Sequence, residues 1–131
     1  MKRVMGVLLL AGALVFVGHA FAKEGKAEAK PTTLKGEVVD TGCYTAHGAS
    51  GEKHKDCGAK CVANGMPMGL LTKDGKVYLL TPDHESADAY NKLKDLIDTQ
   101  VEVTGVVNEK GGMKTIDVTD VKPAATAVNA K

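Results

Sequence analysis

The chain has none of the features that mark several large classes of protein. It contains no tryptophan, aromatic residues make up only 4% of its 131 residues, and 17 basic side chains nearly balance 16 acidic ones. Proteins that follow a phosphate backbone or stack on bases need an excess of basic or aromatic side chains. The composition therefore argues against nucleic acid as a partner.

Motifs of common enzymes are also absent from the sequence. No glycine-rich phosphate loop, nucleophile elbow or HExxH motif occurs, and no pair of carboxylates stands at a recognisable catalytic spacing. The cysteines do not form the CxxC pair of thioredoxin-like oxidoreductases. Covalent haem attachment needs a histidine directly after the second cysteine, where Val62 stands. These absences favour a binding role over an enzymatic one.

Long apolar runs are missing except at the N-terminus. There Lys2 and Arg3 precede the apolar residues 4–17, and a small-x-small triplet follows at residues 20–22, which is the pattern of a secretory signal peptide. The run is short for a bilayer span and no stop-transfer sequence follows it. We therefore predict a signal peptide at residues 1–22 and a periplasmic or secreted protein without membrane insertion after cleavage. The alternative is an uncleaved N-terminal anchor.

The remainder of the chain has the length of one domain. About 109 residues follow the predicted cleavage site, enough for a single hydrophobic core. Residues 23–30 and 124–131 are small, polar and rich in alanine, which predicts flexible tails. Residues 31–123 are then the folded domain.

Alternating apolar residues and turn signals predict a mainly β domain. The predicted strands are residues 33–40, 69–72, 76–81, 101–107 and 113–121. The Asp74-Gly75 pair is a strong signal for a hairpin, and Gly36 and Gly105 in mid-strand indicate bends or bulges. Residues 86–97 place apolar side chains at helical spacing between the third and fourth strands. Five short strands with one helix in this position are typical of the OB-fold, a Greek-key barrel.

Three stretches of the chain resemble small secreted bacterial proteins of OB-fold type. They are LKGEVVD at residues 34–40, VEVTGVV at 101–107 and IDV at 116–118. The likeness covers about residues 33–121 and reflects the geometry of a barrel rather than an activity. It implies an exported OB-fold-like barrel. The Cys/His-rich insertion between strands one and two departs from a minimal barrel and lies at one of the loops by which OB-folds hold ligands.

The reactive side chains gather in one segment, residues 43–68. This segment holds all three cysteines and two of the four histidines, and it is too long for a plain loop in a small domain. Residues 53–64 are predicted to form a short helix within it. Positions three, four and seven residues apart share a helix face. Three candidate ligands follow this spacing: His54, Cys57 and Cys61.

Thiolate and imidazole are ligands that zinc and copper prefer. Cys43, at the end of the first strand, would complete a Cys₃His set, and His47 is a substitute or fifth donor. The predicted metal ligands are Cys43, His47, His54, Cys57 and Cys61. Met66 and Met68 are further soft donors nearby, which favours copper. The CxxxC pair also resembles the copper-binding pair of Sco-type cytochrome oxidase assembly proteins. We expect a copper- or zinc-binding protein in a chaperone, storage or sensing role.

Two other uses of the cysteines stay open. Thiols in an exported protein normally pair, and three is an odd number. One thiol must therefore remain free or pair between chains, unless a metal protects all three. A disulfide of Cys43 with Cys57 or Cys61 would staple the insertion to the barrel, stabilising it by about 2–4 kcal/mol, in a module that binds an envelope protein. The third possibility is a thiol oxidoreductase, in which Lys60 and His54 lower the pKa of a cysteine.

Overall fold

The computed structural model describes residues 30–124, and a single β-sheet in this part of the chain closes into a barrel. The predicted signal peptide (1–22) lies outside the described residues. The two predicted tails (23–30 and 124–131) also lie outside them, except for Lys30 and Ala124. Within the described part no helix has the length and apolar character needed to cross a membrane.

The barrel contains five strands in the order β1-β2-β3-β5-β4. Their bounds are β1 (Thr32–Asp40), β2 (Met68–Thr72), β3 (Val77–Pro82), β4 (Gln100–Lys110) and β5 (Met113–Pro123). β1 pairs antiparallel with both β2 and β4, and the parallel pairing of β3 with β5 closes the barrel. This confirms the predicted OB-fold-like barrel, including the hairpin at Gly75 that joins β2 to β3.

Gly36 lies where β1 passes between its two neighbouring strands. It is opposite Thr72 of β2 and Val101 of β4. A Cβ atom at this position would stand 2.4 Å from the carbonyl oxygen of Leu71. The first strand can therefore curve from one sheet neighbour to the other only because residue 36 has no side chain.

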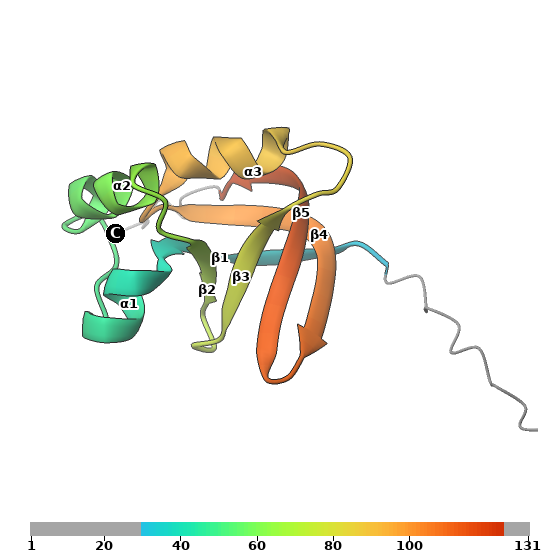
Figure 1. The fold of residues 1–131 in the computed structure, drawn as a ribbon, viewed down its shortest axis with the longest axis horizontal. Coiled ribbons are helices and arrows are strands. Elements are labelled where there is room, and N and C mark those ends of the chain that lie inside the picture. Colours follow the sequence, from blue (N-terminus) through green and yellow to red (C-terminus); the bar gives the residue numbers. More distant parts are fainter. Residues whose placement is uncertain (1–29, 125–131) are drawn as a thin grey trace, which may run out of the picture.

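The hydrophobic core fills the barrel and extends under a helix. Buried side chains from all five strands, among them Val38, Leu70, Val103 and Ile116, form one cluster with Leu93 of α3 (Asp88–Leu93). Figure 1 shows α3 lying across the barrel, ahead of the 3₁₀ turn η1 (Lys94–Leu96). The predicted helix over residues 86–97 is thus shorter than expected. Its final turn tightens to 3₁₀ geometry, as is common at helix C-termini.

The insertion between β1 and β2 contains two helices instead of the single predicted one. The predicted helix over residues 53–64 corresponds to α2 (Lys55–Ala63), whereas α1 (Thr41–His47) was not predicted. Asp40 caps α1, since its Oδ1 accepts the N–H of Cys43 at 2.8 Å, and Gly48 ends the helix with a φ of 66°. In Figure 1 both helices lie at the end of the barrel where β1 leaves the sheet and β2 begins.

Candidate metal centre

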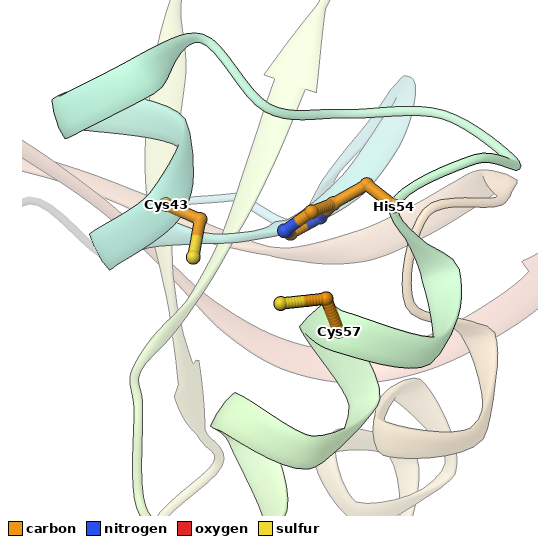
Figure 2. Close-up of side chains that lie close together, drawn as sticks. All are labelled: Cys43, His54 and Cys57. Atoms are coloured by element: carbon orange, nitrogen blue, oxygen red, sulfur yellow. The ribbon is translucent and has the colours of Figure 1, made fainter.

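The three cysteines and His54 come together between α1 and α2. Cys43 lies in the first turn of α1, His54 is the N-cap of α2, and Cys57 and Cys61 lie within α2. One donor atom each from Cys43, His54 and Cys57 lie within 4.8 Å of one another. Figure 2 shows these three side chains pointing toward one another from the two helices.

A second group of donor atoms shares Cys43 with the first. It consists of Asp40, Cys43 and Cys61, again with one donor atom each within 4.8 Å. The predicted Cys₃His set is therefore divided into two groups that meet at Cys43. The division has a simple cause, because Cys57 and Cys61 are about one helical turn apart along α2.

His54 is held by a buried carboxylate that the sequence analysis did not identify. Its Nδ1 lies 2.9 Å from Oδ2 of Asp98, and its side chain is only 12% exposed. An ionised carboxylate can only accept, so in the neutral tautomer that donates to Asp98 the proton is on Nδ1 and Nε2 has a free lone pair. Among residues 30–124, Nε2 of His54 is buried and has no hydrogen-bond partner. The ring is thus oriented and its second nitrogen is available as a ligand.

Asp98 adopts a backbone conformation that is uncommon for a residue with a side chain. Its φ is 55°, and its backbone N–H donates to the carbonyl of Val38 at 2.6 Å. Burial raises the pKa of the Asp98 carboxyl, while the bond to His54 acts in the opposite direction. Such strained and desolvated residues persist where the surrounding structure holds them, often at functional sites.

Asp40 is the second buried carboxylate of the site. Its side chain is fully buried, and Oδ1 is occupied by the cap of α1. Oδ2 lies 3.6 Å from Nε2 of His54, and within the described part of the chain it has no hydrogen-bond partner. Two unsatisfied buried atoms therefore face each other across a gap too long for a hydrogen bond.

The thiol of Cys43 is strongly disfavoured as a thiolate. Burial raises its pKa to about 12, and its contacts with Cys61 and Asp40 act in the same direction. Without a bound cation the group is a protonated thiol at neutral pH, which makes it a poor nucleophile. A metal ion that binds Cys43 must displace its proton.

Gly58 allows α2 to approach the buried carboxylate. A Cβ atom at this position would stand 2.7 Å from Oδ2 of Asp98 and 2.7 Å from Cγ2 of Ile97, and 3.3 Å from Nδ1 of His54. The glycine within the CGAKC stretch weakens helix propensity. Here it is required because any side chain would push α2 away from the Asp98–His54 pair.

The other predicted donors occupy different positions. His47 is exposed at the C-terminal end of α1 and belongs to neither donor group, so its role as a fifth ligand stays a prediction. Met68 is fully buried and belongs to the hydrophobic core, and Met66 packs over Gly42, where a Cβ atom would lie 2.7 Å from its sulfur. Met68 therefore serves packing, which is the commoner use of the residue, whereas the role of the exposed Met66 as a soft donor stays a prediction.

All three cysteines are free thiols in the structure, and Cys43 is close to both of the others. Comparisons of the chain with protein-family models, with curated proteins and with solved structures find no match. Its chemistry is therefore inferred from the donor atoms. Two thiols and an oriented imidazole, with a third thiol and a buried carboxylate beside them, can hold a metal ion.

Proposed function

We propose that this protein binds a copper or zinc ion, and that its role is that of a metal chaperone, store or sensor. Cys43, His54 and Cys57 are the central ligands, and Cys61 is a further thiolate beside Cys43. The observation that carries the proposal is the buried Nε2 of His54, which lacks a hydrogen-bond partner among the described residues and belongs to a ring held beside two sulfur atoms.

The pairing of His54 with Asp98 supports this proposal. Metal-ligating histidines usually donate their second ring N–H to a carboxylate, which fixes the tautomer and strengthens the ligand. The 2.9 Å contact between Nδ1 and Asp98 provides this arrangement. A histidine that served only the core would need a partner for Nε2 as well.

The proposal is tested by native mass spectrometry of the reduced protein after incubation with Zn²⁺ or Cu⁺. We expect a metal adduct with all three thiols reduced, and its loss in His54→Ala. The matched control is His84→Ala, which removes an exposed histidine between β3 and α3 and should leave the adduct unchanged. A wild-type protein that binds neither ion more tightly than a variant with all three cysteines changed to serine would contradict the proposal.

The proximity of Cys43 to both other cysteines supports a second candidate, a disulfide-stapled module that binds an envelope protein. A bridge would lighten the intact mass by a pair of hydrogens and leave one free thiol. Serine substitution of either bridged cysteine would then lower the melting temperature, whereas His54→Ala would not affect thiol pairing.

The cellular location belongs to the same proposal. We place the protein in the periplasm or outside the cell, among small exported OB-fold proteins, on the signal-peptide pattern of residues 1–22. Amino-terminal sequencing of the purified protein tests this assignment, with a new terminus at Lys23 as the expected result.

A further inference from the structure

The buried carboxylate of Asp40 has one oxygen that the fold leaves unsatisfied. Oδ1 caps α1, but Oδ2 has no hydrogen-bond partner within residues 30–124, although the whole side chain is shielded from solvent. A buried carboxylate oxygen without a partner costs free energy, since it has lost its hydration without compensation. Such an atom is explained if a cation completes its environment.

The position of Oδ2 fits a ligand of the same ion that His54 would bind. In a tetrahedral zinc site, bonds of about 2.0–2.2 Å to nitrogen and oxygen place the two ligand atoms roughly 3.3–3.6 Å apart. The distance from Oδ2 of Asp40 to Nε2 of His54 is 3.6 Å. Asp40 also forms a close donor group with Cys43 and Cys61, so its carboxylate lies beside sulfur and nitrogen donors together.

We propose that Asp40 is a direct ligand of the metal ion and that its carboxylate makes the site selective for divalent zinc over monovalent copper. This inference rests on the proposed function and names the ion for that site. Zinc accepts sulfur, nitrogen and oxygen donors in one tetrahedral set. Monovalent copper selects soft sulfur ligands and gains little from a hard carboxylate. A carboxylate ligand therefore strengthens the binding of one ion and leaves the other almost unaffected.

A purely structural use of Asp40 makes a different prediction. In that case the carboxylate caps α1 and pairs electrostatically with a protonated His54, without contacting an ion. Its replacement would then alter the stability of the metal-free protein and change the affinities for both ions in parallel. The ratio of the two affinities separates the two uses, because folding defects affect both ions alike.

The experiment compares the full-length reduced protein with Asp40→Asn and Asp40→Ser. Both substituents cap helices about as well as aspartate, but neither provides the anionic oxygen that faces His54. Affinities for Zn²⁺ and for Cu⁺ are measured separately by competition with chromophoric chelators under anaerobic conditions. We expect the zinc affinity to fall by at least about 100-fold, because loss of a residue that only supports a ligand already costs about 10- to 100-fold. The Cu⁺ affinity should change less than about threefold.

Two control variants make the result specific. Asp98→Asn removes the charge that orients His54. It is expected to lower the affinities for both ions by similar factors, because Asp98 is a positioning residue. Asp56→Asn changes an exposed carboxylate on α2 and should affect neither ion. An unchanged zinc-to-copper ratio in both Asp40 variants would overturn the inference while leaving the metal site intact. A wild-type protein that binds neither ion would overturn the proposed function along with it.

Discussion

A single histidine connects the parts of this site at the scale of individual residues. Nδ1 of His54 lies 2.9 Å from Oδ2 of Asp98, and Nε2 lies 3.6 Å from Oδ2 of Asp40. Its neighbours on the sulfur side are Cys43 and Cys57. The ring therefore lies between Asp98, the buried carboxylate that orients it, and the donors that would bind an ion.

The environment of Cys43 predicts unequal reactivity among the thiols. Its pKa is raised from the ordinary 9.0 to about 12, first by burial, so at pH 8 only about one molecule in ten thousand carries the thiolate that reacts. Cys57 is exposed. We expect iodoacetamide to modify Cys57 first and Cys43 at least tenfold more slowly in the metal-free protein, as followed by peptide mass spectrometry.

The direction of the pH effect follows from the same shift. The rate at Cys43 should continue to rise as the pH approaches 12, because the protonated fraction persists up to that value. Unfolding in denaturant is the control, since it removes the burial and should make the three rates similar. Equal rates for Cys43 and Cys57 in the folded protein at pH 8 would contradict the assigned environment.

At the scale of elements, the site depends on how closely α2 packs against the turn between η1 and β4. Asp98 lies in that turn, and its carboxylate contacts His54, the N-cap residue of α2. Gly58 faces the same carboxylate. The site can therefore form only when α2 packs closely against this turn.

Substitution of Gly58 tests this dependence. Alanine is a better helix former than glycine by about 1 kcal/mol, so Gly58→Ala would stabilise an unconstrained helix. Here the added carbon would approach Oδ2 of Asp98 and the Ile97 side chain to 2.7 Å. We expect a lower melting temperature and at least a tenfold loss of zinc affinity, measured by thermal denaturation and chelator competition.

The adjacent position provides the matched control. Ala59→Gly lies on the exposed side of α2 and loses about 1 kcal/mol of helix propensity. It should lower the stability of the protein and leave the zinc affinity within about threefold. A Gly58→Ala variant that binds zinc like the wild type would show that α2 can shift without disturbing the site.

At the scale of the whole molecule, the donors belong to segments that only the folded barrel brings together. Asp40 ends β1, the cysteines lie on α1 and α2, and Asp98 precedes β4. An ion bound by such groups stabilises the folded chain, since the unfolded chain does not hold the ligands in place.

Addition and removal of zinc should therefore shift global stability. At a free concentration about one hundred times Kd, a ligand specific to the folded state contributes about 2.7 kcal/mol to the free energy of unfolding. We expect chelation to lower the urea midpoint by the corresponding amount. Ile116→Ala removes most of a fully buried core side chain and should lower the free energy of unfolding by about 2–5 kcal/mol. The additional stability that zinc provides should be the same in this variant as in the wild type. If zinc stabilised His54→Ala as much as the wild type, the ion would have to bind at another place.

Much of this protein could be predicted from its sequence, because the relevant signals are local. Alternating apolar residues predict the strands, Gly75 predicts a hairpin, and the spacing of apolar residues predicts α3. The segment that holds all three cysteines was likewise identifiable from residue types alone. Each of these inferences depends on residues within a few positions of one another.

The helix α1 was within reach of the sequence but was missed. Asp40 is a strong N-cap residue and Gly48 lies where a helix of this length ends. The strand pattern continues up to Asp40, so the residue was assigned to the strand and not recognised as the N-cap of α1. A short helix with a glycine in its first turn has little propensity of its own, so the cap and the packing determine it.

Only the tertiary structure decided which side chains form the site. Asp98 is 44 residues from His54 in the chain, and no pattern in the sequence connects them. The antiparallel pairing of β4 with β1 places the start of β4 near the end of β1, and this brings Asp98 to the histidine. The division of the cysteines into two groups around Cys43 likewise depends on how α1 and α2 pack. Local chemistry therefore determined the kinds of ligand, and long-range packing determined their arrangement.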